Sequence, residues 1–167
     1  MEEMSSQVVV DALGLLPMGC YLMTAGYNGQ RSGILVSSVQ KCSDSPSLIC
    51  VAAKKGHKID PLIRDSHSFA IGLIDPGDRM VRRHFRFTDA APKEHPALGD
   101  DDPYDSFETH MLVTGSPILE RCETWFDCEV LRRVDLEAQN ELFVGLVVAV
   151  EHQGVRVTID HVSSDAN

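Results

Sequence analysis

Short apolar segments bounded by Gly, Pro, Asn or Asp run along most of the chain. Two of them, residues 19–25 and 31–38, flank residues 26–29, which read Gly-Tyr-Asn-Gly. Asn-Gly favours a two-residue hairpin turn because both residues tolerate positive φ. The pattern therefore predicts a β-hairpin near the start of the fold.

Further strands are expected where apolar residues alternate with polar ones or form a continuous run. They are predicted at residues 47–53, 69–74, 111–113, 117–120, 122–134, 142–151 and 155–162. Residues 142–150 are apolar on both faces of their strand. We expect the core of the domain to cover one face, and a helix or a second subunit to cover the other.

Three short helices accompany these strands. The first is predicted to be capped by Ser5 or Ser6 and to end before Pro17. The other two are predicted at residues 58–65 and 78–87, followed by a long surface excursion at residues 88–106. Many strands with few helices favour a predominantly antiparallel barrel. The chain has no internal repeat and no linker, so one domain is expected over residues 1–167.

The composition narrows the class of protein. The 167 residues are 43% hydrophobic, which suits one substantial core. A formal charge of -10 argues against a nucleic-acid partner and against an anionic membrane surface. No apolar run is long enough to span a bilayer, and residues 1–4 lack the positive charge of a secretory signal. A cytoplasmic protein is therefore expected.

The five cysteines are scattered and form no Cys-x-x-Cys pair, so we expect reduced thiols rather than a zinc site or a redox disulfide. Cys122 and Cys128 lie an even number of positions apart in an alternating segment, which predicts both on one apolar strand face. Trp125 is out of phase with that face. Either it packs across a dimer interface or it lines a substrate pocket, and we favour the interface.

A local reversal of charge occurs in this acidic chain. Lys54, Lys55 and Lys58 lie within five residues, and Ser37 and Ser38 end an earlier predicted strand. An apolar run separates the two groups, so they can lie at neighbouring strand ends. Ammonium groups, backbone N–H groups and hydroxyls together suit a bound phosphate. The alternative is a solvated helix start, and charge patterning alone does not choose between them.

Several common sites lack their signature in the chain. There is no Gly-x-Gly-x-x-Gly after a strand, no Walker phosphate loop, no Gly-x-Ser-x-Gly elbow and no His-Glu-x-x-His. These absences argue against the common hydrolase and Rossmann classes. No metal site is assigned.

The order of segments between residues 15 and 152 resembles the flavin reductase-like family, whose fold is an FMN-binding split β-barrel. The segments that carry the resemblance are residues 22–25 before the Asn-Gly turn, then 33–38, 43–48, 54–58 and 68–73, then 115–119 with 126–130, and last 142–150. Their order and spacing match those of the family.

The resemblance implies a mainly β fold, an antiparallel split β-barrel of the Greek-key type with a few short peripheral helices. It also implies a homodimer with one FMN per subunit near the interface, reduced by NAD(P)H or by a protein electron donor. The matching positions are Gly33, Ile34, Ser37 and Ser38 for the flavin ring and ribityl chain, and Lys55, His57 and Lys58 for the phosphate turn, with Lys54 as a fourth candidate. Gly33 would let the backbone approach the cofactor closely. No catalytic residue is assigned.

Three positions depart from the residues usual in the family. Ile59 stands where the phosphate turn of the family often has Thr. Gly72 stands where the family commonly has Asn after the strand that is led by an aromatic residue. Residues 138–140 read Ala-Gln-Asn where the reductases often carry Gly-Asp-His. A His available to the nicotinamide is therefore missing at Asn140.

Residues 79–86 contain four arginines and His84. One interpretation is a mobile basic segment that meets the phosphates of NAD(P)H or closes over the flavin. The alternative is an exposed amphipathic helix whose charges are simply solvated.

Three functions remain open. The first, which we prefer, is an NAD(P)H-dependent reductase that passes hydride to FMN and supplies reduced flavin to a partner oxygenase. The second is an FMN electron carrier reduced by a protein donor, which the Asn at position 140 favours. The third is a non-catalytic split-barrel binder of flavin or of another anionic ligand, such as haem or pyridoxal phosphate.

Overall fold

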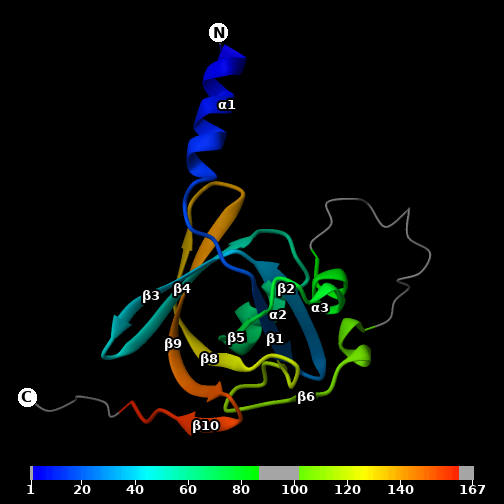
Figure 1. Cartoon of the computed structure of the whole chain (residues 1–167). Helices are drawn as coiled ribbons and strands as arrows, with labels where there is room; N and C mark the ends of the chain where they lie inside the picture. Colours follow the sequence, from blue (N-terminus) through cyan, green and yellow to red (C-terminus); the bar gives the residue numbers. More distant parts are fainter. Residues whose placement is uncertain (1, 87–101, 162–167) are drawn as a thin grey trace, which may run out of the picture.

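The structure is a computed structural model that describes residues 2–86 and 102–161. Its main feature is an eight-stranded antiparallel sheet in the order β2-β1-β5-β8-β9-β4-β3, with β10 paired to β9. Figure 1 shows this sheet curled into an open barrel. Its strands are β1 (Tyr21–Tyr27), β2 (Gln30–Val36), β3 (Ser38–Asp44), β4 (Ser47–Lys54), β5 (Ser68–Leu73), β8 (Thr124–Asp135), β9 (Asn140–His152) and β10 (Val155–Thr158). A small second sheet pairs β6 (Thr109–His110) with β7 (Ile118–Leu119).

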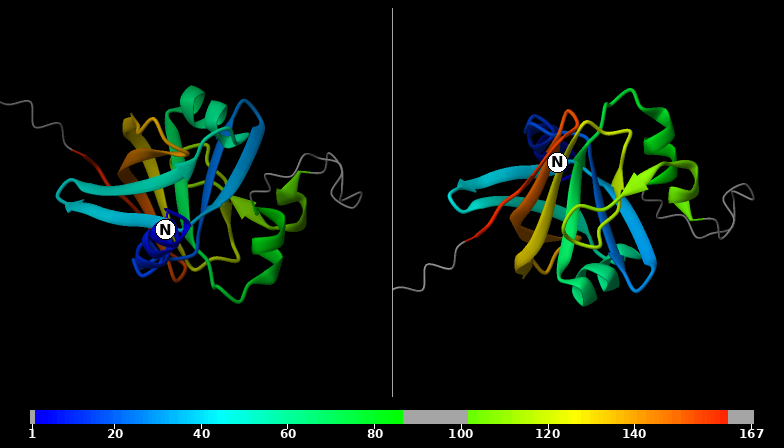
Figure 2. Two further views of the ribbon diagram at one scale, coloured as in Figure 1. Left: turned by 90° about the horizontal axis from the view of Figure 1, so that it is seen from above. Right: turned by 90° about the horizontal axis from the view of Figure 1, so that it is seen from below.

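The helices of the described part are short and lie around this barrel. They are α1 (Glu2–Leu13), α2 (Ile59–Ser66), α3 (Arg79–His84) and the 3₁₀-helix η1 (Pro103–Ser106). Figure 1 shows α1 projecting away from the barrel, and Figures 1 and 2 show the β3–β4 hairpin extending from the side of the barrel. None of the described helices has the length and apolar character needed to cross a membrane. The predicted mainly β, antiparallel barrel with few helices is confirmed.

The predicted hairpin is formed by β1 and β2, which pair from Tyr21 with Val36 to Tyr27 with Gln30. Asn28 and Gly29 occupy its turn with φ of 49° and 77°. Because the left-handed region is open to these two residues, this turn could be predicted from sequence.

Strand β3 was not expected from the sequence. It pairs with β4 from Ser38 with Ala52 to Asp44 with Ser47, and only Val39 and Ser43 of its residues are not fully exposed. β3 lies at the edge of the sheet, where backbone pairing does not require an apolar face. Its polar sequence therefore lacks the alternation by which strands are predicted.

Two cores lie on opposite faces of the central strands. The first fills the barrel and includes Met23, Ile34, Val51, Phe69 and Phe143. The second lies outside β1 and β5, beneath α3, η1 and β7, and includes Leu22, Phe85, Tyr104, Ile118 and Trp125. Strands β1 and β5 are thus buried on both faces by the chain itself.

Trp125 belongs to the second core, so its interpretation as an interface or pocket residue is wrong. Its side chain is 0% exposed, and its indole N–H donates to the Leu119 carbonyl oxygen at 3.0 Å. The alternation correctly placed Trp125 opposite the barrel interior. It could not show that β7, η1 and α3 cover that second face, because those elements lie elsewhere in the chain.

Cys122 and Cys128 are both buried, but they do not share a face. Cys122 lies in the second core and Cys128 in the first. Cys122 precedes β8, which begins at Thr124, and its N–H donates to the Leu119 carbonyl oxygen in a turn. Phe126 and Cys128 both pack in the first core, so the alternation holds within β8 but does not extend back to Cys122.

Several predicted boundaries are also corrected. Helix α1 begins at Glu2, so Ser5 and Ser6 lie inside it rather than at its cap. Residues 111–113 form no strand, and β10 ends at Thr158. Most of the predicted surface excursion, residues 88–101, lies outside the described part, whereas residues 103–106 form η1 with Tyr104 buried.

Candidate functional site

The register of the sheet brings the predicted serines and lysines to neighbouring strand ends. Ser38 begins β3 and pairs with Ala52, which lies two residues before Lys54 on β4. Ser37 lies directly before Ser38, between β2 and β3. We call Ser37, Ser38 and residues 54–58 together the serine–lysine edge. The role of these residues in binding stays a prediction.

The two serines present their hydroxyls to solvent. Both residues are exposed, and within the described part neither hydroxyl is hydrogen-bonded to another residue. The Ser37 carbonyl oxygen accepts the Gly19 N–H at 2.9 Å, which holds the connection between α1 and β1 against this edge. The hydroxyls are therefore available to a ligand, while the backbone beneath them is held in place.

Gly33 and Ile34 are not brought to this edge. Ile34 is 1% exposed and belongs to the barrel core. A Cβ atom on Gly33 would lie 2.7 Å from the Tyr104 hydroxyl and 2.8 Å from a Phe85 ring carbon. Internal packing thus explains why position 33 is glycine, and any contact of these two residues with a cofactor would have to come from their main chain.

The lysine turn has a compact backbone. Gly56 has a φ of 81°, and its N–H donates to Asp60 Oδ2 at 2.8 Å. The Lys55 N–H donates to the Gln139 carbonyl oxygen at 3.0 Å, which ties the turn to the β8–β9 connection. The Asp60 N–H donates to the His57 carbonyl oxygen at 3.1 Å as α2 begins. Hydrogen bonds on both sides therefore define the shape of this turn.

His57 is not a cation of this turn near neutral pH. Burial lowers the pKa of its imidazole, and the charge of Lys58 lowers it further. Its Nδ1 accepts the Ile59 N–H at 3.2 Å, so the neutral ring carries its proton on Nε2. His57 can thus donate a hydrogen bond to an anion but adds no full charge.

Two carboxylates lie among these donors. The Lys55 ammonium is ion-paired with Asp135, and this hydrogen bond lowers the pKa of the Asp135 carboxyl. Burial raises the pKa of Asp60, although the Gly56 N–H acts in the opposite direction. Within the described part, Asp60 Oδ1 is buried without a hydrogen-bond partner. The lysine turn is therefore less positive than its sequence suggests.

An ion pair with one buried partner, Glu141, lies beside the turn. Arg133 donates to both oxygens of Glu141 at 2.6 and 2.8 Å, and its guanidinium lies 5.5 Å from the centre of the Phe143 ring. Asn140, the residue before Glu141, pairs with Lys54 across β4 and β9. The position where the reductases often carry His is thus at the serine–lysine edge, and here it holds a side chain that does not titrate.

Part of the basic segment after β5, residues 79–86, is held against the rest of the fold by contacts of His84 and Phe85. His84 Nδ1 lies 2.8 Å from the Met80 carbonyl oxygen, and its ring packs edge-on against Phe107. The Phe85 carbonyl oxygen accepts the Leu35 N–H at 3.2 Å, which joins the end of α3 to β2. Arg79, Arg82, Arg83 and Arg86 are exposed. This geometry suits the amphipathic helix alternative for residues 79–84, and a role in NAD(P)H binding stays a prediction.

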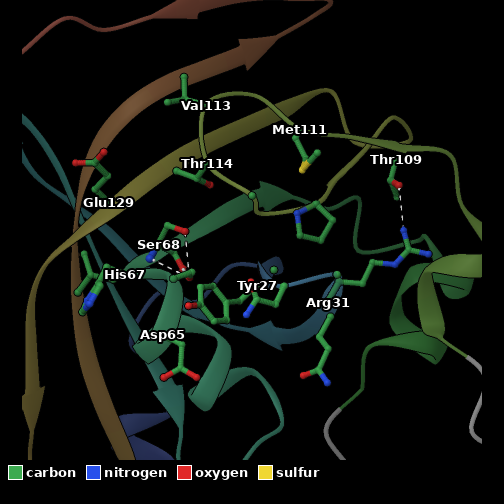
Figure 3. Close-up of a pocket in the computed structure, with 18 of the residues that line it drawn as sticks. Tyr27, Arg31, Asp65, His67, Ser68, Thr109, Met111, Val113, Thr114 and Glu129 are labelled. Carbon is green, nitrogen blue, oxygen red and sulfur yellow. Dashed lines mark hydrogen bonds between the residues drawn. The ribbon is translucent and has the colours of Figure 1, made fainter.

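A cavity of about 810 Å³ lies at the other end of α2, where β1 meets β2 (Figure 3). Tyr27, Arg31, Asp65, Met111 and Glu129 are among the residues that line it. It contains none of the residues predicted to bind flavin. This cavity and the serine–lysine edge are therefore separate places, and the predicted anion site lies at the edge.

Hydrogen bonds hold the walls of this cavity in place. Arg31 Nε donates to Asp102 at 2.6 Å. Asp127 is 0% exposed and accepts from the Val113 and Thr114 N–H groups at 2.8 and 2.7 Å. Sequence analysis missed the cavity because its residues come from segments far apart in the chain, and no local pattern joins them.

No metal centre accompanies these features in residues 2–86 and 102–161. No group of three or more His, Cys, Asp or Glu side chains there could hold a metal ion.

A comparison with known protein families identifies the family of this chain. A sequence model of the family described as "Flavin reductase like domain" matches residues 13–158. The chain belongs to this family. The match covers the whole sheet from β1 to β10 and includes every residue of the serine–lysine edge.

Two kinds of known protein are similar to this chain in sequence. "FMN reductase (NADH) RutF" of Ancylobacter novellus is 24% identical over 144 residues, which are 86% of this chain and 75% of that protein. "Diflavin flavoprotein A 1" of Synechocystis sp. is 27% identical over 127 residues, which are 74% of this chain. The chain spans only about a fifth of the length of the diflavin flavoproteins that it matches.

Solved structures share the fold at low identity. The NADH:FAD oxidoreductase SgcE6 of Streptomyces globisporus C-1027 superposes with a TM-score of 0.69 at 18% identity, covering 92% of each chain. Flavoredoxin of Methanosarcina acetivorans superposes with a TM-score of 0.67 at 18% identity, covering 91% of this chain and 90% of that one.

Proposed function

We propose that this chain is a flavin reductase that binds FMN and passes to it a hydride from NADH or NADPH. The observation that carries the proposal is the serine–lysine edge, where two exposed hydroxyls and three lysines lie at neighbouring strand ends in a chain of the flavin reductase family. The name of the relative in Ancylobacter novellus supports FMN and NADH as the pair of substrates. Reduced flavin would then serve an oxygenase or another electron-transfer partner.

The residues of the edge fit the parts of FMN. The cofactor supplies the hydride-accepting ring when it is bound, and the protein orients it. Lys54, Lys55 and Lys58 would hold the phosphate, with His57 as an uncharged donor. Ser37 and Ser38 would donate to the ribityl chain or the ring, and Gly33 and Ile34 would contribute main-chain atoms only.

A cytoplasmic location belongs to the same proposal. All five cysteines are free thiols, which suits a reducing compartment.

The first prediction concerns the phosphate turn. The double variant Lys55→Ala/Lys58→Ala is expected to weaken FMN binding about 100-fold, because two charge-assisted contacts to the phosphate are lost. Riboflavin, which has no phosphate, should bind as before. Titration of flavin fluorescence measures both affinities. Lys41→Ala, on the β3–β4 hairpin, is the control and should change neither. An equal loss for both flavins would contradict the phosphate assignment.

An FMN electron carrier is the second candidate, because Asn140 offers no titratable group to a nicotinamide. The purified protein with FMN should be mixed with NADH or NADPH without oxygen. Bleaching of the flavin absorbance supports the reductase. Flavin that stays oxidised with nicotinamide but is reduced by a protein donor supports the carrier, and flavin that neither donor reduces supports a non-catalytic binder.

We further propose a homodimer. Helix α1 leaves apolar side chains exposed along its length, including Val8 at 63%, Val9 at 55% and Leu13 at 60%. A single 12-residue helix is marginal in water without a packing partner. On β9, Leu142, Val144 and Leu146 remain partly exposed. A second copy of the chain would cover both surfaces.

The second prediction tests this dimer. Val9→Lys/Leu13→Lys is expected to weaken self-association about 30-fold, because two apolar side chains would no longer be buried at the interface. Sedimentation velocity over a range of concentrations measures the change. Gln7→Lys, on the same helix, is the control and should leave the dimer intact. A wild-type chain that sediments as a monomer at all concentrations would contradict the proposal.

A further inference from the structure

We propose that Asp135 and Asp60 compete with the flavin phosphate for the donors of the lysine turn. They would thereby limit how strongly this chain prefers FMN over riboflavin. The inference rests on the proposed function, since it concerns the same site, and it assigns a specificity-determining role to two residues that sequence analysis did not consider.

Asp135 already forms an ion pair with one lysine of the turn, Lys55. Lys55 is ion-paired with Asp135, and its backbone N–H donates to Gln139 in the same β8–β9 connection. The carboxylate of Asp135 is itself oriented by the Glu137 N–H at 2.8 Å. Two donors therefore fix this carboxylate beside the turn, where it satisfies the ammonium group that a phosphate would need.

Asp60 occupies a second donor. Its Oδ2 accepts the N–H of Gly56, whose left-handed conformation would otherwise direct that N–H outward as an anion donor. Asp60 lies in the first turn of α2, where a carboxylate is favoured by the helix dipole. Its other oxygen is buried without a partner in the described part, so the carboxylate is held at some cost. A phosphate could displace it.

The two carboxylates therefore stand where the phosphate oxygens would stand. FMN gains its contacts with Lys55 and Gly56 only after the protein gives up contacts of its own, so these two contacts add less to FMN binding than they would without the carboxylates. Lys58 is exposed and, within the described part, has no ion-pair partner, so it remains open to a first contact. Riboflavin avoids the competition altogether.

The third prediction tests this competition with neutral isosteres. Asp135→Asn is expected to tighten FMN binding about fivefold and to leave riboflavin binding within about twofold, because only the phosphate uses Lys55. Asp60→Asn should act in the same direction but more weakly, since its amide oxygen can still accept the Gly56 N–H. Both affinities are measured by flavin fluorescence on the full chain at one ionic strength.

Two controls separate a local competitor from a change of overall charge. Asp65→Asn removes the same charge from the other end of α2, beside the cavity, and should change neither affinity. In a Lys55→Met background, Asp135→Asn should no longer tighten FMN binding, because the donor is gone. Thermal unfolding of each variant verifies that the fold is retained.

The outcomes are distinct. An Asp135→Asn variant that leaves FMN binding unchanged, or that tightens both flavins equally, overturns the inference while the proposed function stands. The same tightening in the Lys55→Met background also overturns it. A wild-type chain that binds neither FMN nor riboflavin overturns the proposed function itself.

Discussion

Replacing Trp125 with alanine is expected to lower the free energy of unfolding by about 4 kcal/mol. The indole is 0% exposed and packs in the second core beside Leu22 and Ile118. Gly72 lies so close that a Cβ atom there would be 2.5 Å from the ring. Alanine would leave a large cavity, and the carbonyl oxygen of Leu119 would lose the indole N–H that it accepts.

Urea unfolding at one fixed protein concentration measures this loss, because self-association would make the apparent stability depend on concentration. Trp125→Phe is the matched control and should lose only about 2 kcal/mol, since the smaller ring keeps much of the packing. Self-association should be unchanged in the folded variants. A loss below about 1 kcal/mol for alanine would show that the second core is not packed as described.

Replacing Arg133 with alanine is expected to cost about 3 kcal/mol, because it leaves the carboxylate of Glu141 buried without its counter-charge. Glu141 has a side-chain exposure of 3%, and both of its oxygens accept from Arg133. The guanidinium also covers the ring of Phe143. Since the Arg133 side chain is 41% exposed, water can partly replace it, which places the cost at the lower end for a broken buried pair.

Arg132 provides the matched control for this prediction. Its guanidinium donates to the carbonyl oxygen of the neighbouring Leu131, and the residue is exposed. Arg132→Ala should therefore change stability by less than about 0.5 kcal/mol. The double variant Arg133→Leu/Glu141→Leu should recover most of the loss, because no charge remains buried. Equal losses for Arg132→Ala and Arg133→Ala would contradict the role of the buried pair.

Much of the strand pattern could be predicted because its signals are local. The Asn28-Gly29 turn and the apolar runs of β4, β5 and β9 depend on neighbouring residues and on the twofold alternation of strands. The family could be recognised for the same reason, since its segments occur in a constant order. Strand β3 was not predicted, because a polar edge strand is determined by its pairing partner rather than by the pattern of its own side chains.

The candidate site was predictable only in part. Its serines and lysines are adjacent in sequence within each group, and strand pairing brings the two groups to one edge. Gly33 and Ile34, in contrast, lie in two different packing environments that a family position does not reveal. Asp135 is 80 residues from Lys55 in the sequence. No local pattern could therefore predict the ion pair that offsets part of the positive charge of the lysine turn.

From its sequence alone, the chain's family, the antiparallel character of its fold and the lysine turn of its candidate site could be determined. These properties follow from local conformational preference and from charge, which neighbouring residues carry. Only the tertiary structure decided that Trp125 is core, that Cys122 and Cys128 lie in different cores, and that carboxylates occupy the donors of the lysine turn. Those outcomes depend on which elements cover each face of a strand and on which distant side chain pairs with each charged group. Both are determined by packing between segments that are far apart in the sequence.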